Sequence, residues 1–180
     1  MSIIIKRADV FHAGAIALIG KASFRHAFEH LFKDKEDLFE YLEYTYDPVK
    51  LSRSIRKESR VYFLATYNGD PVGFAKVKTH SLNDKIDSVS QIEFQKIYVL
   101  PQYQGKGVGS ALLLEVTKLA KEISPDYIWL DTHVGNEKAI RLYEKNGFQK
   151  IGKHFFTIGS QSFEYHVMGL PVLAEQKVAV

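Results

Sequence analysis

Apolar positions recur along the chain with two different periods, and these periods divide it into strands and helices. Apolar side chains return every three or four positions over Val10–Phe24 and Gly107–Ile123, as on one face of a helix. Short runs rich in β-branched and aromatic residues predict strands. The predicted strands are Ser2–Arg7, Arg60–Tyr67, Val72–His80, Ile92–Val99 and Tyr127–Thr132, with strand-like segments at Phe148–Gly152, Phe155–Ile158 and Phe163–Met168. The other predicted helices are Lys35–Tyr46, Pro48–Lys57 and Asn136–Asn146.

The segments between these elements predict how the strands connect. Residues 68–71 read Asn-Gly-Asp-Pro, a strong turn signal, so the strands on either side are expected to form a hairpin. The polar segment Ser81–Ser90 is predicted to be a loop. Near residue 100 a strand runs through a loop into a long helix and then into another strand, as a parallel crossover does. The sequence therefore predicts a mixed α+β fold with a largely antiparallel sheet.

Composition narrows the class of protein. The chain has 180 residues with 46% hydrophobic and 25% charged residues, which predicts one globular domain over residues 1–180. The formal net charge of +3 does not indicate a nucleic-acid partner. The absence of cysteine excludes disulfides, thiolate metal sites and a cysteine nucleophile. No apolar run approaches the ~20 residues of a membrane span, so we expect a soluble, cytoplasmic protein with no membrane partner.

The segment 97–110 carries the clearest chemical signal. It reads Ile-Tyr-Val-Leu-Pro-Gln-Tyr-Gln-Gly-Lys-Gly-Val-Gly-Ser, so a glycine-rich loop joins a predicted strand to a predicted helix. Glycines let main-chain N–H groups turn toward an anion, and the start of a helix adds a partial positive charge. Lys106 could add a full charge at the rim. The segment predicts a diphosphate site that requires no metal.

Three glycine-loop patterns compete for this segment. A Walker A loop needs Gly, four residues and then Gly-Lys-Ser/Thr, which is absent. A dinucleotide-binding fingerprint would use Gly105 and Gly107 but would place Ser110 at its third glycine position. The pattern Gln/Arg-x-x-Gly-x-Gly/Ala is matched in full by Gln104, Gly107 and Gly109. A plain glycine turn before a helix is the remaining alternative.

The last of these patterns is the coenzyme A pyrophosphate loop of the GNAT superfamily of N-acetyltransferases, and the whole segment resembles that family. Residues 136–148 read Asn-Glu-Lys-Ala-Ile-Arg-Leu-Tyr-Glu-Lys-Asn-Gly-Phe and resemble a second GNAT signature, Asn-x-x-Ala-x-x-x-Tyr-x-x-x-Gly-Phe. Ala139 and Tyr143 are four residues apart and share one helix face. A helix cap at Asn136 and a core tyrosine at Tyr143 are the structural alternatives.

The resemblance implies a fold, a cosubstrate and a set of binding residues. The fold is the GNAT fold, a mostly antiparallel sheet of about seven strands with four to five helices, and the cosubstrate is acetyl-CoA. The residues implied to bind it are Ile97, Tyr98, Val99, Gln104, Gly105, Lys106, Gly107, Val108, Gly109, Ser110, Asn136, Ala139, Tyr143 and Lys145. GNAT proteins are often dimers, so a homodimer is a further expectation.

The resemblance also implies a mechanism, in which a primary amine attacks the acetyl group directly. An alkyl amine has a pKa of ~10.4 and must first lose a proton. Glu93 is the predicted base, where family members often carry glutamate, and strict strand alternation would place residues 93, 95, 97 and 99 on one face. A solvent-facing glutamate is the alternative. A backbone N–H near Tyr98 and Val99 would hold the thioester carbonyl. Tyr143 would protonate the leaving thiolate.

The acceptor is less sharply predicted. Residues 33–47 contain six acids and two bases, which would suit a cationic amine or would simply form a solvated helix face. Segments 70–77 and 152–159 resemble the PaiA-like branch, which includes spermidine/spermine N-acetyltransferases, so a polyamine is one expected acceptor. His154 could line the pocket or be structural. Acetylation of protein N-termini or amino acids, and a non-catalytic CoA-binding role, stay open as alternatives.

Overall fold

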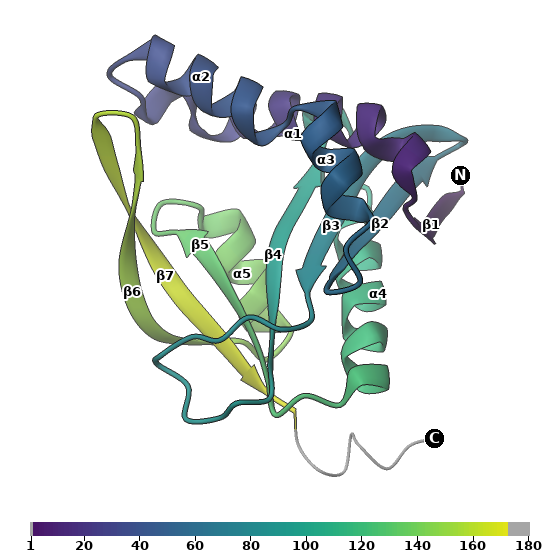
Figure 1. Ribbon diagram of the computed structural model, residues 1–180, viewed down its shortest axis with the longest axis vertical. Helices are drawn as coiled ribbons and strands as arrows, with labels where there is room; N and C mark the ends of the chain where they lie inside the picture. Colours follow the sequence, from purple (N-terminus) through teal and green to yellow (C-terminus); the bar gives the residue numbers. More distant parts are fainter. Residues whose placement is uncertain (1, 173–180) are drawn as a thin grey trace.

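The computed structural model describes residues 2–172, which form one seven-stranded sheet in the order β1-β2-β3-β4-β5-β7-β6 (Figure 1). Every neighbouring pair is antiparallel except β4 and β5, which are parallel. The strands are β1 (Ile3–Arg7), β2 (Arg60–Tyr67), β3 (Asp70–Lys78), β4 (Gln91–Val99), β5 (Tyr127–His133), β6 (Gln149–Ile158) and β7 (Gln161–Pro171). The predicted α+β class and the single parallel crossover are confirmed.

Helices cover both faces of the sheet (Figure 1). They are α1 (Ala13–Phe28), α2 (Lys35–Thr45), α3 (Pro48–Ile55), α4 (Val108–Ile123) and α5 (Glu137–Lys145). Helices α1, α2 and α3 pack against one face of the sheet, and α4 and α5 pack against the other. Among residues 2–172, no helix has both the length and the apolar character that crossing a bilayer requires.

Two predicted boundaries were wrong for local reasons. The first helix was expected over Val10–Phe24, but it begins at Ala13, after a short 3-10 turn whose first N–H groups are capped by Asp9. It continues to Phe28, because Phe24 and Phe28 are both buried against the sheet. The three strand-like segments near the C-terminus are in fact one long hairpin, β6 and β7.

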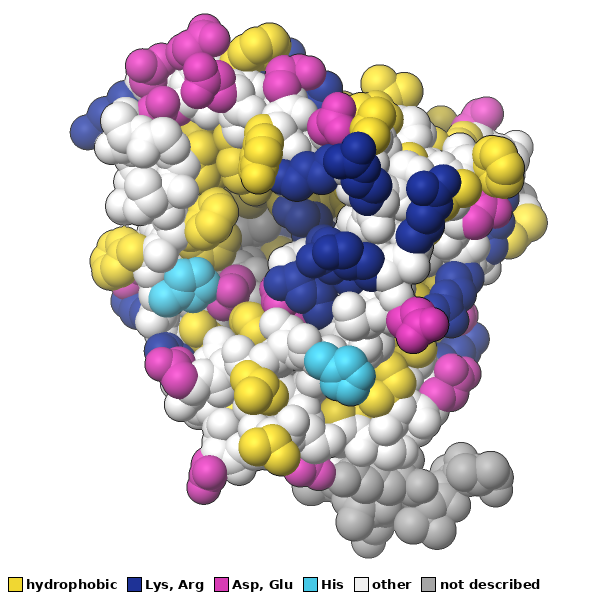
Figure 2. Space-filling view, in the orientation of Figure 1, with side chains coloured by type: hydrophobic (Ala, Val, Ile, Leu, Met, Phe, Trp, Pro, Cys, Tyr) yellow, Lys and Arg dark blue, Asp and Glu magenta, His cyan; other side chains and the backbone are white. Residues whose placement is uncertain are grey.

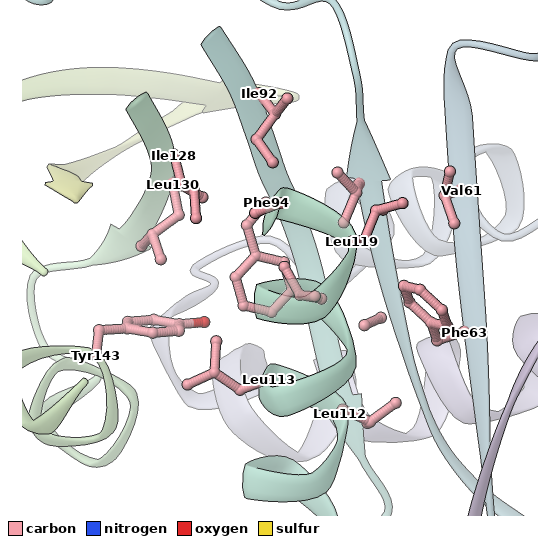
Figure 3. Packing of buried hydrophobic residues seen from close by; sticks show 14 of the residues in the cluster. Val61, Phe63, Ile92, Phe94, Leu112, Leu113, Leu119, Ile128, Leu130 and Tyr143 are labelled. Carbon is pink, nitrogen blue, oxygen red and sulfur yellow. The ribbon is translucent and has the colours of Figure 1, made fainter. Parts of the chain in front are cut away.

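The core beneath α4 and α5 holds Tyr143 in place. Tyr143 is 5% exposed and extends from α5 toward Phe94 of β4 and Leu113 of α4 (Figure 3). The rings of Phe94 and Tyr143 meet edge to face, with centroids 6.1 Å apart and planes at 83°. Burying side chains of this size contributes roughly 1.5–3 kcal/mol each. The packing fixes the direction in which Tyr143 points.

A β-bulge in β4 shapes the middle of the sheet. Val77 of β3 pairs with Phe94 of β4, and the residue before it, Lys76, pairs with Lys96. Gln95 therefore has no partner on β3. A bulge of this kind bends the strand and shifts its alternation by one residue. The expectation that residues 93, 95, 97 and 99 share one face was therefore wrong. Glu93 lies on the same face as Lys76 and Lys96, and Ile97 lies on the opposite face.

The parallel pair separates soon after it begins. β4 and β5 are paired only from Gln91–Glu93 to Tyr127–Trp129. Beyond these three residue pairs, the main chain of Gln95–Val99 has no strand on its β5 side. The bulge and the separation together open a wedge between the two strands at the level of α5 and the start of α4.

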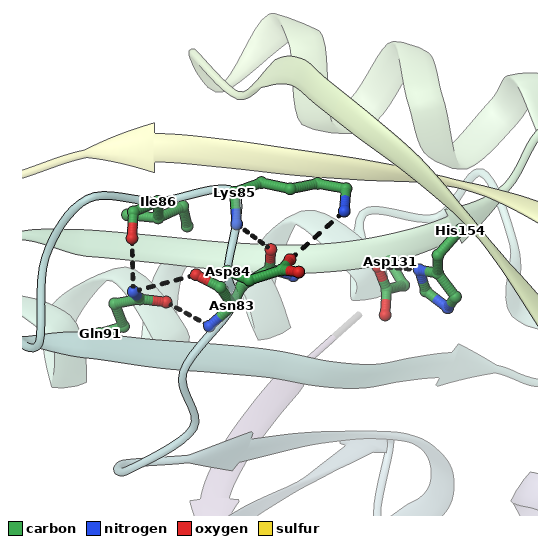
Figure 4. A network of polar contacts seen from close by, with 7 residues as sticks. All are labelled: Asn83, Asp84, Lys85, Ile86, Gln91, Asp131 and His154. Carbon is green, nitrogen blue, oxygen red and sulfur yellow. Dashed lines mark hydrogen bonds and ion pairs between the residues drawn. The ribbon is translucent and has the colours of Figure 1, made fainter.

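Gln91 holds the long loop before β4 in place. It is 3% exposed, and its side-chain oxygen accepts from the main-chain N–H of Asn83 at 2.8 Å (Figure 4). Its side-chain nitrogen donates to the main-chain oxygens of Asn83, Ile86 and Ser88. One buried amide therefore satisfies four backbone groups of the loop, and the loop in turn covers Trp129.

Replacing Gln91 with leucine should destabilise the protein, because the loop's backbone groups would lose their buried partners. We expect Gln91→Leu to lower the free energy of unfolding by about 2–4 kcal/mol in urea denaturation. Gln149→Leu, at an exposed position on β6, is the matched control and should change it little. Equal unfolding midpoints for the two variants would contradict this role of Gln91.

Candidate active site

A cavity of about 470 Å³ lies beside the end of β4, where β5 no longer pairs with it. It extends from the end of β4 along the glycine loop to one side of α5. Its lining residues are Ser23, Ile97, Tyr98, Val99, Gln104, Gly105, Gly107, Gly109, Ser110, Asn136, Lys138, Ala139, Leu142 and Tyr143. Eleven of the predicted binding residues are thereby brought together from three separate elements.

The glycine loop has the backbone conformation that its sequence predicts. Gly105 and Gly107 have φ angles of +77° and +86°, in the left-handed region that side chains other than glycine rarely adopt. Gly107 is the N-cap of α4, and no side chain caps the first N–H groups of this 16-residue helix. Gln104 joins the loop to α5, since its Oε1 accepts a hydrogen bond from Lys138 Nζ at 3.2 Å. Unpaired N–H groups at a helix start attract an anion.

Three predicted binding residues lie outside the cavity lining. Val108 is 1% exposed and packs into the core, so its side chain faces away from the loop. Lys106 extends over the rings of Tyr67 and Tyr103, with its Nζ about 5 Å from each centroid. Lys145 is exposed and lies two residues beyond Tyr143, which turns its side chain to the opposite side of α5.

The second GNAT-like signature forms the other wall. Asn136 caps α5, its Oδ1 accepting from the Ala139 N–H at 3.3 Å. Its predicted capping role is therefore confirmed, and it also lines the cavity. Gly147, with φ of +88°, directly follows the C-cap residue Asn146 of α5, a position that favours glycine. Ala139 and Tyr143 lie one turn apart on the face of α5 that borders the wedge.

A smaller cavity of about 80 Å³ adjoins the first. The two share Ile97, Tyr98, Asn136, Ala139 and Tyr143. The smaller cavity is otherwise lined by Phe28, Phe94, Gln95, Lys96, Asp131, Thr132, His133 and Tyr165. Tyr143 thus borders both cavities. The glycine loop lines the larger cavity, and the charged side chains of Lys96 and Asp131 line the smaller one.

Comparison with known proteins identifies this arrangement. The model of the Acetyltransferase (GNAT) family matches residues 20–148, well over half of the chain, and includes both signatures.

The chain belongs to the GNAT family of acetyltransferases.

Individual relatives agree with this assignment. An uncharacterised N-acetyltransferase of Lactobacillus delbrueckii subsp. lactis is 24% identical over 124 residues, which are 69% of this chain and 72% of the relative. A spermine/spermidine N(1)-acetyltransferase of Bacillus subtilis is 33% identical over 88 residues, 48% of this chain and 58% of the relative. The protein is accordingly an N-acetyltransferase.

A solved structure has the same fold. The PaiA N-acetyltransferase of Thermoplasma acidophilum, in complex with coenzyme A, superposes with a TM-score of 0.76 at 20% identity. The superposition covers 96% of this chain and 100% of that chain. The predicted GNAT fold is confirmed, with seven strands and five α-helices in the described part of this chain.

Buried polar atoms without partners mark the two cavities of this GNAT enzyme. In the described part of the chain, four buried side-chain oxygens lack a hydrogen-bond partner: Ser23 Oγ, Tyr46 Oη, Gln95 Oε1 and Asp131 Oδ1. Those of Ser23, Gln95 and Asp131 belong to residues that line the cavities. Buried oxygens are normally hydrogen-bonded, so these three have a free capacity to accept hydrogen bonds at the cavities.

Asp131 is the one carboxylate among the described residues that line the two cavities, and the sequence motifs do not point to it. Burial raises its pKa from 3.8 to about 6, although His154 opposes the rise. Its Oδ1 lies 3.3 Å from His154 Nδ1, without the geometry of a hydrogen bond (Figure 4). His154 stacks on Tyr165, with ring centroids 5.8 Å apart. The sequence does contain one signal for this residue: Asp131 is the single acid in the otherwise largely apolar strand β5.

Glu93 has a different environment from the one predicted. It is 7% exposed, so it is not a solvent-facing residue, yet it does not line either cavity. Its Oε2 accepts hydrogen bonds from Lys78 Nζ at 2.7 Å and from Ser81 Oγ at 2.6 Å. These two partners hold the carboxylate beside Lys78, on the face of the sheet that α1, α2 and α3 cover. We call this face the floor of the sheet.

Two further lysines lie on this floor. Lys76 of β3 is 9% exposed, and it sits directly opposite the partly buried Lys96 of β4. Burial, together with the neighbouring Lys96, Arg60 and Lys78, lowers the pKa of Lys76 from 10.5 to about 7. Burial lowers the pKa of Lys96 to about 8. Near neutral pH this part of the GNAT enzyme is only partly protonated.

The lowered pKa of Lys76 predicts a pH-dependent cost to folding. Between pH 7 and 10.5 the unfolded chain binds the Lys76 proton more tightly than the folded chain, so this contribution to stability rises with pH. We expect Lys76→Met to be more stable than the parent at pH 6 by on the order of 2 kcal/mol, and this difference to vanish toward pH 10.

Urea denaturation of both proteins across this pH range measures the difference directly. Lys118→Met, at an exposed position on α4, is the control for replacing a lysine with methionine. A constant difference between Lys76→Met and the parent would rule out a depressed pKa at Lys76.

Proposed function

We propose that this GNAT enzyme transfers the acetyl group of acetyl-CoA to a primary amine, which attacks it directly. The observation that carries the proposal is that the two cavities adjoin one another and share five lining residues, Tyr143 among them. One runs from the glycine loop to Tyr143, and the other runs from Tyr143 to Asp131. A bound acetyl-CoA supplies an activated acetyl thioester. The residues of the chain then have three tasks: to grip the diphosphate, to orient the carbonyl and to move protons.

The larger cavity suits the cofactor. The loop at Gly105–Gly109 and the uncapped start of α4 offer main-chain N–H groups to the diphosphate. Ala139 leaves room for an extended arm beside α5, and the free main-chain edge of Ile97–Val99 offers it hydrogen bonds. PaiA of Thermoplasma acidophilum, whose fold matches this one, was crystallised with coenzyme A.

Tyr143 is proposed to stabilise the departing thiolate. Its hydroxyl has no hydrogen-bond partner among residues 2–172, and the side chain borders both cavities. Burial raises its pKa above the ordinary value of 10, which keeps the hydroxyl protonated at neutral pH. A thiol has a pKa near ~8.5, below that of tyrosine, so full proton transfer from Tyr143 to a free thiolate is uphill on relative basicity. The proposed role of the hydroxyl is therefore to donate a hydrogen bond to the sulfur as the C–S bond breaks and negative charge develops there.

Asp131 is proposed to accept the proton from the attacking amine. Asp131 Oδ1 and Gln95 Oε1 make no hydrogen bond within residues 2–172, so both can accept hydrogen bonds from the amine N–H groups at the small cavity. A carboxylate with a pKa of about 6 is a stronger base than an exposed one. Glu93 remains the alternative base through a water relay, although Lys78 and Ser81 occupy its Oε2.

The identity of the amine is a finer proposal. The name of the Bacillus subtilis relative favours a polyamine, and the acidic helix α2 could attract one. Protein N-termini and amino acids are the other acceptor classes, and a non-catalytic CoA-binding protein is the alternative from a different class. A single-domain homodimer also remains a prediction, which light scattering of the purified chain tests.

Binding and turnover measured together test the proposed function. Calorimetry is expected to show saturable 1:1 binding of acetyl-CoA, and a thiol-release assay is expected to show CoA production only when a primary amine is present. Binding without turnover on any amine would favour the non-catalytic alternative. No binding of acetyl-CoA would refute the proposal as a whole.

Tyr143→Phe should lower kcat far more than it weakens acetyl-CoA binding. The variant keeps the ring packed against Phe94 and removes only the proposed hydrogen-bond donor to the sulfur. We expect kcat to fall about 10²-fold, with the calorimetric Kd of acetyl-CoA changed less than about threefold. Tyr127→Phe, on a ring that lines neither cavity, is the matched control. Unchanged turnover in Tyr143→Phe would remove this residue from the mechanism.

Asp131→Asn should lower kcat/KM about 10²-fold, because the amide cannot accept the amine proton. In the parent, activity should decline as the pH falls through about 6, where the Asp131 carboxylate becomes protonated. The pH profile of Asp131→Asn should lack this acidic limb, while Glu93→Gln should retain it. If Glu93→Gln loses the limb and Asp131→Asn keeps it, the two roles are reversed.

A further inference from the structure

We propose that the acceptor amine also carries an anionic group, a carboxylate or a phosphate, which binds between Lys76 and Lys96 on the floor of the sheet. This inference rests on the proposed function, because it names the class of amine that the same site acetylates. It differs from the polyamine expectation, because a polyamine carries further positive charges besides its reactive nitrogen, whereas this acceptor carries a negative charge.

The first argument is the direct opposition of two ammonium groups. Lys76 and Lys96 are register partners on β3 and β4, and like charges directly opposite one another destabilise a sheet. Both side chains lie among aromatic rings: Lys76 Nζ is 5.4 Å from the ring centroid of Tyr62, and Lys96 Nζ is 5.3 Å from that of Tyr46. Aromatic faces stabilise cations only modestly, so they do not replace an anion.

The second argument is the lack of a partner carboxylate. Within residues 2–172, neither the Lys76 nor the Lys96 ammonium makes an ion pair or a hydrogen bond with a side chain. Neighbouring Lys78, by contrast, is paired with Glu93 at 2.7 Å. Buried charges in proteins are normally paired. A bound anion would supply the missing charge and would favour the protonated form of both lysines.

The third argument is the balance of charge around the two lysines. The groups that act on them electrostatically are Arg60 of β2, Lys78 of β3, Lys50 of α3 and Glu93 of β4. Among these groups one acid faces five bases when the pair itself is included, and the other nearby carboxylate, Asp131, lines the small cavity with Lys96. Lys and Arg side chains gather around a hollow in the face of the molecule over β3, β4 and α3 (Figure 2). The acidic side chains of α2 form a separate group at the upper rim.

The fourth argument is the position of Lys96. It lines the same small cavity as Asp131, Gln95 and Tyr143, so the lysine pair begins where the acceptor nitrogen is proposed to bind. A short acceptor can therefore place its amine at Asp131 and its anionic group at Lys96 and Lys76. A diamine of the same length would place a second cation against both lysines.

Three acceptors of equal chain length separate these possibilities: 4-aminobutyrate, butylamine and 1,4-diaminobutane. We expect kcat/KM for 4-aminobutyrate to exceed that for each of the other two at least tenfold. 3-Aminopropylphosphonate tests whether a phosphate-like group is preferred to a carboxylate. Calorimetry of the products with the CoA-loaded enzyme provides a readout that is independent of turnover, and 4-acetamidobutyrate should bind at least tenfold more tightly than N-butylacetamide.

Variants of Lys76 and Lys96 test whether these two side chains cause the preference for an anionic acceptor. Lys96→Met and Lys76→Met should each lower kcat/KM for 4-aminobutyrate at least tenfold more than they lower that for butylamine. Lys118→Met, on the far side of the sheet, should change neither. Circular dichroism checks folding, and Lys96→Gln replaces Lys96→Met if the latter is unfolded.

The outcomes distinguish the inference from the proposed function. A preference for butylamine or the diamine, or equal losses on all three amines in the lysine variants, would overturn the anionic acceptor while leaving acetyl transfer intact. Acetyl-CoA binding without turnover on any of the four amines would overturn it as well. Failure to bind acetyl-CoA would instead overturn the proposed function itself.

Discussion

The site depends on one constraint: β4 and β5 can pair as parallel strands over only three residues. The bulge at Gln95 bends β4 where this pairing stops, and the separated strands leave a free main-chain edge over Ile97–Val99. Helices α4 and α5 then present the glycine loop and Tyr143 to the same opening. A sheet with continuous β4–β5 pairing would have neither the cavity nor a path between its two ends.

The same opening explains why so many costly groups are concentrated there. Asp131, Lys76 and Tyr143 each have a pKa displaced by burial, and the oxygens of Gln95 and Ser23 lack partners. At neutral pH the shifted pKa values of Asp131 and Lys76 and the oxygens without partners reduce the stability of the unliganded protein, whereas the neutral hydroxyl of Tyr143 does not. Together they fit a site in which an amine, a thioester and an anionic group replace solvent and complete the missing interactions.

Much of the fold and half of the site could be predicted from the sequence, because those parts depend on local chemistry. The glycine loop needs left-handed backbone at Gly105 and Gly107, and α5 needs a cap at Asn136, so both leave recognisable residues. The bulge at Gln95 leaves no such mark, since glutamine fits regular strand and bulge alike. Strict alternation therefore put Glu93 on the wrong face.

The burial and the shifted pKa values of the charged residues in the sheet could not be predicted for a related reason. Lys76, Lys96 and Asp131 lie on three strands, and only the register of the sheet and the covering helices bring them near one another. The sequence shows lysines and an aspartate in strands but not which of them are buried. Their perturbed pKa values follow from tertiary burial.

The central claim is that the wedge between β4 and β5 grips a CoA diphosphate and directs its thioester toward Tyr143. A titration of ¹⁵N-labelled protein with CoA tests it most directly, because each main-chain N–H reports its own environment. The account predicts saturable shifts that are largest for the amides of Ile97–Val99 and Gly105–Ser110. An absence of saturable shifts, or shifts centred away from the wedge, would contradict it.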